Sequence, residues 1–165
     1  MKILVTGNLG YVGNVLTRSL LEQKIDVIGC DTGFYPQGFL DLETSKCTQI
    51  KKDIRSLSVE DLKGVSGICH LAALSNDPLG EINPNLTEEI NYKATIRLAK
   101  LAKEAKVEKF IFSSSCSSYG MNENIVNEES KLAPLTAYAK SKVNSEIEIS
   151  KLSDSNFCTT NLRSA

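Results

Sequence analysis

The sequence contains no tryptophan, a single histidine and almost no excess of charge, with 19 basic against 20 acidic residues in 165. It has no basic block and no interleaving of aromatic with basic residues, which argues against a dedicated nucleic-acid-binding protein. No apolar run approaches the roughly 18 residues of a membrane span. The chain begins with a strand-like segment, without the charged and apolar regions of a signal peptide. We therefore expect a cytoplasmic protein that binds a small ligand and contacts neither nucleic acid nor membrane.

Closely spaced cysteine pairs are also missing. The cysteine count is odd and there is no C-x-x-C motif, so the sequence predicts neither a disulfide framework nor a zinc site. The only histidine, His70, has no partner at metal-ligand spacing, and we expect it to be structural. No metal site is predicted. The five cysteines, expected to be reduced thiols packed mostly in strands, are Cys30, Cys47, Cys69, Cys116 and Cys158.

What is present begins with a glycine-rich turn. Residues 2–6 form an apolar, β-branched run, followed by G-N-L-G-Y-V-G at 7–13 and then a helical pattern. Glycine is needed where a phosphate approaches the backbone closely, and a helix N-terminus offers N–H groups to an anion, so this pattern predicts a pyrophosphate site. The next strand, 25–30, ends in Asp31. A carboxylate there can bind an adenosine ribose and would repel the 2′-phosphate of NADP, which favours NAD.

Strand-like and helical patterns alternate along the whole chain. This alternation predicts an α/β fold with a doubly wound, Rossmann-like parallel sheet and helices on both faces. The fourth strand ends in small residues, which leave room for a ligand at the switch point of the sheet. Residues 76–80 are interpreted as a loop near the substrate site. The expected strands span 2–6, 25–30, 48–52, 66–73, 109–114 and 157–162, and the longer helices span about 85–106 and 136–151.

Tyr138 and Lys142 stand four residues apart in T-A-Y-A-K-S-K. On a helix these positions share a face, so the Lys142 ammonium can lie near the phenol and lower its pKa. Such a phenol can take a proton from an alcohol. Ser115, just after the strand-like run, could hydrogen-bond the same alcohol or the carbonyl that it becomes. Alone, the Y-x-x-x-K pattern also fits an ordinary pair on a helix surface; the glycine-rich turn favours the catalytic interpretation.

Together these motifs resemble the amino-terminal half of an extended short-chain dehydrogenase/reductase, of the NAD-dependent nucleotide-sugar epimerase/dehydratase family. The T-G-x-x-G-x-x-G motif matches residues 6–13, H-x-A-A matches 70–73 and S-S-x-x-x-Y-G matches 114–120. The resemblance implies that Ser115, Tyr138 and Lys142 are catalytic, and that Tyr138 and Lys142 also contact the cofactor. The other NAD contacts that it implies are Gly7, Gly10, Tyr11, Val12, Gly13, Asp31, Asp53, Ile54, Leu71, Ala72, Ala73 and Asn91.

Within this family the chain looks most like a UDP-hexose 4-epimerase. Dehydratases of the family carry an Asp-Glu pair after the active-site Ser/Thr, and here Cys116 and Ser117 occupy those places. The resemblance implies that Tyr138 takes the sugar C4 hydroxyl proton as hydride passes to NAD, giving a 4-keto sugar that turns and is reduced on its other face. Ser115 would polarise the oxygen, and Lys142 would tune Tyr138 and hold the nicotinamide ribose. The alternatives are an NAD(P)-dependent reductase or dehydrogenase of a nucleotide-linked keto sugar, and a non-catalytic NAD-binding module.

Members of this family are longer than this chain, and their C-terminal part supplies most of the nucleotide-sugar site. We therefore expect residues 1–165 to be an incomplete NAD-binding domain, from a truncated protein or a partial gene, with little or no activity by itself. In the family, the helices equivalent to those near 85–106 and 136–151 pair with their copies. The resemblance thus implies a homodimer.

Overall fold

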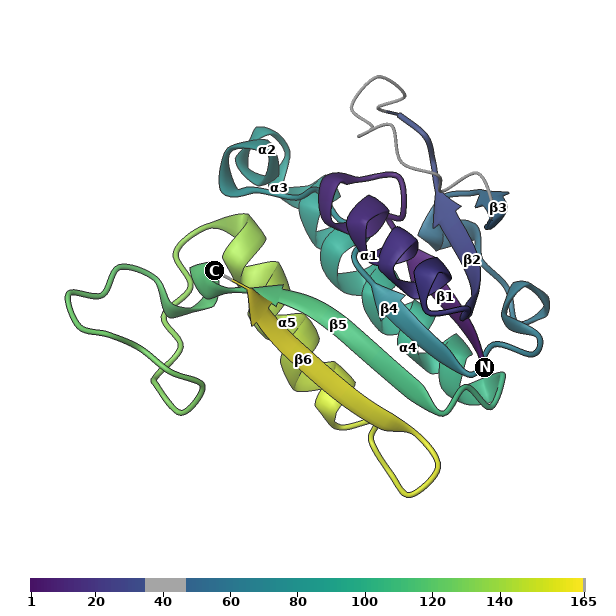
Figure 1. Ribbon diagram of the computed structural model, residues 1–165. Helices are drawn as coiled ribbons and strands as arrows, with labels where there is room; N and C mark the ends of the chain where they lie inside the picture. The colour runs from purple at the N-terminus through teal and green to yellow at the C-terminus, as the bar shows by residue number, and fades with distance from the viewer. Residues whose placement is uncertain (35–46, 165) are drawn as a thin grey trace.

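The computed structural model describes residues 1–34 and 47–164. In this part of the chain, six strands form one sheet in the order β3-β2-β1-β4-β5-β6, and all neighbouring pairs are parallel. The strand order reverses between β1 and β4, which is the switch point of a doubly wound sheet (Figure 1). The strands are β1 (Lys2–Thr6), β2 (Asp26–Asp31), β3 (Thr48–Lys51), β4 (Gly67–His70), β5 (Lys109–Ser115) and β6 (Cys158–Ser164).

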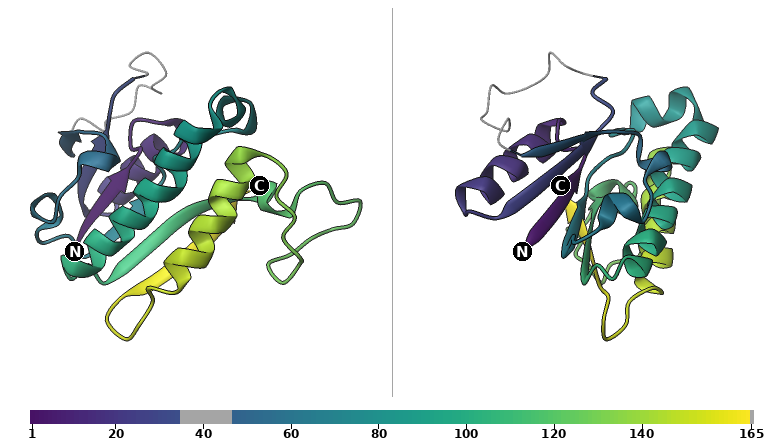
Figure 2. Two further views of the ribbon diagram at one scale, coloured as in Figure 1. Left: turned by 180° about the vertical axis from the view of Figure 1, so that it is seen from behind. Right: turned by 90° about the vertical axis from the view of Figure 1, so that its right-hand side faces the viewer.

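Helices cover both faces of this sheet. Figure 2 shows α1 on one face and the two long helices α4 and α5 side by side on the other. The predicted α/β class and the Rossmann-like parallel sheet are therefore confirmed. The α-helices are α1 (Tyr11–Glu22), α2 (Asp77–Ile82), α3 (Pro84–Thr87), α4 (Ala94–Glu104) and α5 (Ala137–Ser150). The short 3-10 turns are η2 (Ile54–Ser56), η3 (Glu60–Leu62) and η5 (Cys116–Tyr119).

The hydrophobic core lies between the sheet and the layer formed by α4 and α5. On β5, Phe110 and Phe112 are inaccessible to solvent and pack in one cluster with Leu98 of α4 and Ile149 of α5. Ile111 lies between them in sequence, points to the opposite face and is only half-buried. This alternation holds β5 in the sheet and brings its last residue, Ser115, to the carboxyl edge.

His70 is a buried structural residue at the end of β4. Its ring nitrogens lie 2.6 Å from the Thr6 hydroxyl and 2.8 Å from the Thr95 hydroxyl. The ring stacks against Phe112, with 5.9 Å between the ring centroids. Burial lowers the pKa of His70 to about 3, so the ring is neutral at physiological pH. The side chain thus links β1 to α4 and takes no proton near neutrality.

The helix predicted at 85–106 is not one regular α-helix. Between α3 and α4 the chain forms a π-helical turn, η4 (Glu88–Lys93), in which the hydrogen bonds span one residue more than in an α-helix. The buried residue of this turn is Asn91, whose side chain is hydrogen-bonded to the backbone of Leu74. Neither this helix nor any other in the described part of the chain is long and apolar enough to cross a membrane.

Candidate cofactor and active site

The glycine-rich turn forms a tight backbone cradle between β1 and α1. Gly7 has a φ of +71°, in the left-handed region that favours glycine. A Cβ atom on Gly7 would lie 2.8 Å from the backbone nitrogen of Ala72, and one on Gly13 would lie 2.1 Å from the carbonyl oxygen of Gly7. Helix α1 starts at Tyr11 and Val12 without a side-chain cap. Its first N–H groups are therefore available to an anion such as a pyrophosphate.

Asp31 lies at the carboxyl end of β2, beside the same turn. One carboxylate oxygen accepts a hydrogen bond of 2.8 Å from the N–H of Gly33, and the other accepts one of 3.3 Å from the N–H of Leu9. Gly10, the N-cap residue of α1, follows Leu9 directly. These bonds hold the carboxylate next to the start of α1, where an acid can reach the ribose of a dinucleotide.

Asp53 and Ile54 are placed differently from one another. The Asp53 carboxylate accepts hydrogen bonds from the backbone N–H of Arg55 at 2.8 Å and from its guanidinium at 2.8 and 3.1 Å. Arg55 also reaches Glu89 at 2.6 Å. The Arg55 guanidinium lowers the pKa of Asp53, so the carboxylate stays charged. Ile54 is 5% exposed and belongs to the core, so its side chain does not line an open site.

The segment after β4 approaches the glycine cradle closely. The N–H of Leu71 donates to the carbonyl of Thr6 at 3.1 Å, and the N–H of Ala72 donates to the Thr6 hydroxyl at 3.3 Å. Ala73 continues this segment to Leu74. Asn91 accepts from the Leu74 N–H at 2.8 Å and donates to the Leu74 carbonyl at 3.0 Å. Both ends of this buried amide are thereby used, so Asn91 acts by holding the segment.

Ser115 and Tyr138 come together at the carboxyl edge of the sheet. Ser115 ends β5, and its hydroxyl accepts a hydrogen bond of 3.1 Å from the N–H of Ser117 at the start of η5. Tyr138 lies in the first turn of α5 and is 8% exposed. Burial raises the pKa of Tyr138, and a hydrogen bond from Ser115 lowers it to a smaller extent. The two side chains that the sequence predicted to act on one alcohol therefore lie near each other at this edge.

Lys142 follows Tyr138 by one helical turn and is 3% exposed. Its Nζ donates a 2.7 Å hydrogen bond to the carbonyl oxygen of Ser113 and lies 4.8 Å from the ring centroid of Phe112. The centroid of the Tyr138 ring is 5.5 Å away. The ammonium is directed at Ser113, and burial, not Lys142, has the largest effect on the pKa of Tyr138, which it raises. Burial also lowers the pKa of Lys142 itself to about 8.

The segment near 76–80, interpreted from the sequence as a loop, forms the short helix α2. Asn76 is its N-cap, with its side chain accepting from the N–H of Leu79 at 2.9 Å, and Pro78 stands in the first turn. An Asn cap followed by proline is a helix-start signal that could have identified α2. Its first residue, Asp77, contacts the elements that carry Ser115 and Tyr138, a placement that the sequence did not predict.

Glu146 and Arg163 form a second group that sequence reasoning missed. Nη2 of Arg163 lies 2.7 Å from Oε2 of Glu146, and the two side chains are 18% and 6% exposed. Glu146 also accepts a hydrogen bond from the hydroxyl of Ser114, and Arg163 donates to the Tyr119 hydroxyl at 3.1 Å. The pair joins α5 to β6 beside Ser114, the residue that precedes Ser115 on β5. Seventeen residues separate its members, so no local pattern indicates the contact.

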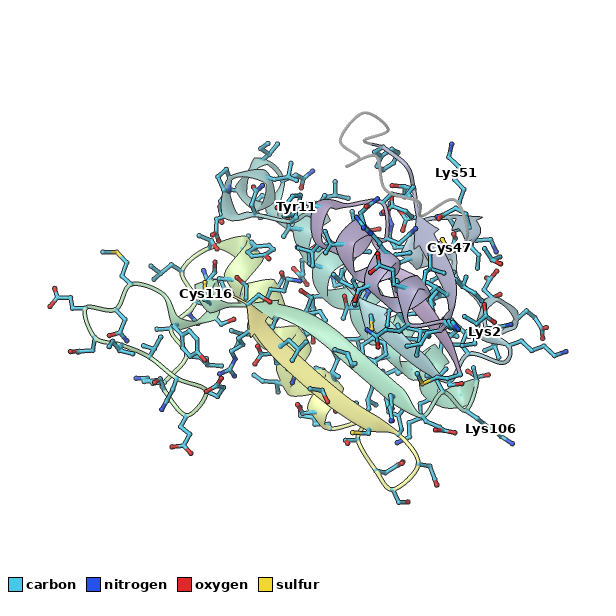
Figure 3. The ribbon with its side chains drawn as sticks, in the orientation of Figure 1. Lys2, Tyr11, Cys47, Lys51, Lys106 and Cys116 are labelled. Carbon is cyan, nitrogen blue, oxygen red and sulfur yellow. The ribbon has the colours of Figure 1, made fainter. Side chains whose placement is uncertain are left out.

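The candidate residues gather at one edge of the sheet. Figure 3 shows Tyr11, at the start of α1, and Cys116, directly after β5, on the edge where the parallel strands end. Lys2 and Lys106 mark the opposite edge. The carboxyl edge of a doubly wound sheet is where ligands of this architecture bind.

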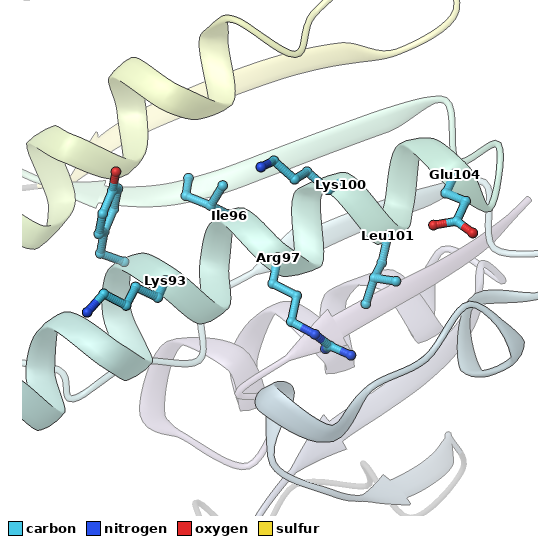
Figure 4. A pocket seen from close by; sticks show the side chains of 7 residues that line it. Lys93, Ile96, Arg97, Lys100, Leu101 and Glu104 are labelled. Atoms are coloured by element: carbon cyan, nitrogen blue, oxygen red, sulfur yellow. The ribbon is translucent and has the colours of Figure 1, made fainter.

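A shallow hollow of about 430 Å³ lies elsewhere, on the outer side of α4 (Figure 4). It combines apolar side chains with a basic rim and lies apart from the glycine cradle. The residues that line it are Tyr92, Lys93, Ile96, Arg97, Lys100, Leu101 and Glu104.

Comparison with known proteins gives one consistent family. The NAD-dependent epimerase/dehydratase family matches residues 3–165. An uncharacterised UDP-glucose epimerase of Bacillus subtilis, YtcB, is 33% identical over 159 residues, which cover 88% of this chain and 50% of that protein. A UDP-glucose 4-epimerase of Lactobacillus helveticus is 28% identical over 149 residues, covering 87% of this chain and 44% of that protein. The chain thus spans about half the length of the curated relatives that it matches.

Solved structures agree. TunA, an NAD-dependent NDP-hexosamine 5,6-dehydratase of tunicamycin biosynthesis, matches 98% of this chain with a TM-score of 0.89 and 27% identity. MoeE5, solved in complex with UDP-glucose and NAD, matches 99% with a TM-score of 0.86 and 28% identity. The match covers 54% of each of these chains.

Proposed function

This chain belongs to the NAD-dependent epimerase/dehydratase family, and from that membership we propose that it binds NAD and serves hydride transfer on a nucleotide sugar. The observation that carries the proposal is the assembly of Ser115, Tyr138 and Lys142 at the end of β5, on the sheet edge that also carries the glycine cradle. A cradle that any Cβ would fill fits the pyrophosphate of a dinucleotide. The Asp31 carboxylate favours NAD over NADP.

The reaction in this proposal is a 4-epimerisation through transient oxidation at the sugar C4 hydroxyl. The Tyr138 oxygen takes the hydroxyl proton, and Ser115 donates a hydrogen bond to the same sugar oxygen. NAD, when bound, supplies the hydride acceptor, and the positive charge of its oxidised ring favours the Tyr138 phenolate. Lys142 holds a second positive charge 5.5 Å from the Tyr138 ring centroid. Once the keto sugar has turned, the same hydride would return to the other face of C4 as Tyr138 returns the proton to the oxygen, which gives the epimer.

Cys116 and Ser117 favour epimerisation over dehydration. These residues follow Ser115 directly, at the start of η5. Neither offers the carboxylate acid and base that loss of water from a sugar requires at this place. The 4-epimerase reaction needs only a group that removes and returns one proton, which Tyr138 provides.

A reductase or dehydrogenase of a nucleotide-linked keto sugar is the second candidate. Burial raises the pKa of Tyr138, so the phenol is protonated at neutral pH. A protonated phenol is suited to donate to a carbonyl oxygen, which is the reductive direction. The two candidates differ in cofactor use, because a reductase consumes added NADH or NADPH and an epimerase shows no net redox change.

The third candidate is a non-catalytic NAD-binding module. Relatives such as YtcB are covered over about half of their length, 50% in that case. Residues 1–165 would then be an incomplete NAD-binding domain that holds the cofactor without turnover. NAD binding is common to all three candidates and is therefore the property to measure first.

Pairing of two copies through α4 and α5 belongs to the same proposal. The two helices lie side by side on one sheet face (Figure 2), and the outer side of α4 carries the apolar hollow with Ile96 and Leu101. Ile147 of α5 is also 49% exposed. A monomer mass at micromolar concentration in analytical ultracentrifugation would contradict a homodimer.

A cytoplasmic location is in keeping with five free cysteines.

Calorimetric titration of NAD and NADP into the chain, after unfolding and refolding to remove any carried cofactor, tests the proposal. We expect saturable NAD binding and much weaker NADP binding. Absence of binding by either dinucleotide would contradict it.

Turnover is tested by following the interconversion of UDP-glucose and UDP-galactose with NAD present. Replacement of Tyr138 by Phe should abolish any interconversion while sparing NAD affinity, because the substitution removes only the hydroxyl. Unchanged turnover in Y138F would exclude the role of Tyr138.

A further inference from the structure

Helix α2 packs directly against the first turn of α5. A Cβ atom on Gly80 would lie 3.0 Å from the Cβ atom of Tyr138, so a larger residue would require one helix to shift by a few tenths of an ångström. Asp77 and Glu81 stand one helical turn apart on α2. Glu81 accepts a hydrogen bond from the N–H of Ala137, the first residue of α5. Two carboxylates therefore meet the positive end of the α5 dipole.

Asp77 differs from Glu81 because it contacts two elements at once. One of its oxygens accepts a hydrogen bond of 3.2 Å from the Ser117 hydroxyl, and the other accepts one from the Thr136 hydroxyl. Ser117 belongs to the turn after β5, and Thr136 is the N-cap of α5. Asp77 therefore joins the turn that follows the catalytic serine to the helix that carries the catalytic tyrosine.

Both partners of Asp77 lie next to a candidate catalytic residue: Ser117 is hydrogen-bonded to Ser115, and Thr136 lies two residues before Tyr138. The N–H of Ser117 donates to the Ser115 hydroxyl at 3.1 Å. The Thr136 hydroxyl accepts from the N–H of Ala139 at 3.0 Å, which fixes the first turn of α5 around Tyr138. Both oxygens of Asp77 are engaged by hydroxyl groups. This arrangement suits a residue that holds two elements together rather than one that exchanges protons with a substrate.

We propose that Asp77 is a positioning residue, which sets the position of the Ser115 hydroxyl relative to the Tyr138 phenol by bridging Ser117 and Thr136. The consequence for catalysis rests on the proposed function, because only there do Ser115 and Tyr138 share a sugar oxygen. The bridge itself is a property of this chain and is measurable without turnover.

Asp77 affects Tyr138 in two ways that have to be separated. Burial raises the pKa of Tyr138, as do the nearby charges of Asp77 and Cys116, while the hydrogen bond from Ser115 lowers it. The Lys142 ammonium lies on the same helix, 5.5 Å from the ring centroid. Removal of Asp77 therefore deletes a charge and also loosens Ser115. A double-mutant cycle isolates the second effect, because the charge contributes equally to both arms.

The experiment measures the pKa of Tyr138 in four proteins: the parent, S115A, D77A and D77A/S115A. Fluorotyrosine is incorporated because its ring fluorine lowers the phenol pKa into a range where the protein stays folded, and Y138F assigns the fluorine NMR signal. In the parent, S115A should raise the pKa of Tyr138. In the D77A background, the same change should produce less than half of that shift. An equal shift in both backgrounds, or no shift in the parent, overturns the proposal.

E81A is the matched control. Glu81 lies on the same face of α2 as Asp77, and its carboxylate also accepts a hydrogen bond from the start of α5. Among the described residues, it has no hydrogen bond to the turn after Ser115. The S115A shift should be as large in E81A as in the parent. A shift reduced as much as in D77A would mean that any loosening of α2 has this effect, and would overturn the specific role of Asp77.

S117A provides a second route if D77A does not fold. It removes the hydroxyl that reaches Asp77 and keeps the N–H that donates to Ser115. The S115A shift should again be reduced, and an undiminished shift counts against the bridge.

NAD titration into D77A separates the two proposals. If NAD binds and the cycle shows no coupling, only the role of Asp77 fails; if coupling is present and NAD does not bind, only the proposed function fails.

Discussion

The Nζ atom of Lys142 lies 2.7 Å from the carbonyl oxygen of Ser113, so the ammonium of α5 is anchored on the strand that presents Ser115. The contact is buried, and burial lowers the pKa of Lys142 from 10.5 to about 8. A buried cation thus fixes the strand that carries Ser115 and at the same time loses its proton more easily than an exposed lysine.

This pKa predicts how stability depends on pH. Between pH 8 and pH 10.5 the unfolded chain keeps the Lys142 proton and the folded chain has lost it, so stability rises with pH in this window. Relative to K142M, the free energy of unfolding of the parent should rise by about 3 kcal/mol across the window. Urea unfolding of both proteins over this pH range measures the difference. A constant difference would show that Lys142 titrates normally.

Gly7 and Gly64 form a matched pair for testing the cradle. Their φ angles are +71° and +74°, but a Cβ on Gly7 meets Ala72 at 2.8 Å, whereas nothing lies within 4 Å of one on Gly64. G64A should cost about 1 kcal/mol of stability through backbone strain and leave NAD binding unchanged. G7A should cost more and weaken NAD binding at least about tenfold, because the turn must shift. Equal behaviour of the two variants in denaturation and calorimetry would contradict the close approach.

Asp31 is expected to determine the choice between NAD and NADP. Its carboxylate is held by the N–H groups of Gly33 and Leu9 at 2.8 and 3.3 Å. D31N removes the charge that opposes a 2′-phosphate, so the ratio of NADP to NAD affinity should rise at least about tenfold, which corresponds to an electrostatic difference of about 1.4 kcal/mol or more. Competition titrations with both dinucleotides give this ratio. D26N, which removes an exposed acid at the other end of β2, should leave it unchanged.

The ion pair of Glu146 and Arg163 should contribute far more to stability than an exposed pair. R163M leaves the Glu146 carboxylate buried without its partner and should destabilise the protein by about 3–5 kcal/mol. The double variant E146M/R163M should cost less than the sum of the single variants, because neither charge remains. R18M breaks the exposed pair with Glu22, whose side chains are 51% and 62% exposed, and should cost under about 1 kcal/mol. Thermal unfolding compares these variants; additive single effects would show that the pair is not coupled.

The features of the fold that the sequence predicted are those with local causes. The glycines at 7, 10 and 13, the β-branched runs and the alternation of strands with helices reflect backbone sterics and periodicity, and from them the sequence predicted a doubly wound parallel sheet. The proximity of Ser115 and Tyr138 was predicted from the strand end and the Y-x-x-x-K spacing, and their catalytic roles by resemblance. Most boundaries differ from expectation by a few residues, as with β6 at Cys158–Ser164.

The remaining features depend on pairings that are distant in sequence. Helix α5 buries polar side chains, among them Ser141 and Ser145, so apolar periodicity does not reveal which side faces the sheet. The direction of the Lys142 ammonium follows from where the Ser113 carbonyl lies, 29 residues away. Asp77 likewise meets Thr136 across 59 residues. Such contacts are set by the packing of α2 and α5 on the completed sheet and have no signature in a short window.

The π-helical turn at Glu88–Lys93 also sets a limit on insertions and deletions. Each hydrogen bond of the π-helical turn spans one residue more than a hydrogen bond of the α-helix α4 does. Deletion of one residue within the turn would be absorbed by conversion to regular α-helix, which would keep α3 and α4 in place and shift only the residues of the turn itself. Asn91 would then leave the backbone of Leu74, and the strand end beside the glycine cradle would lose its tether. In a comparison of homologous chains, a single-residue gap at this point would therefore mark a change in the cofactor site itself.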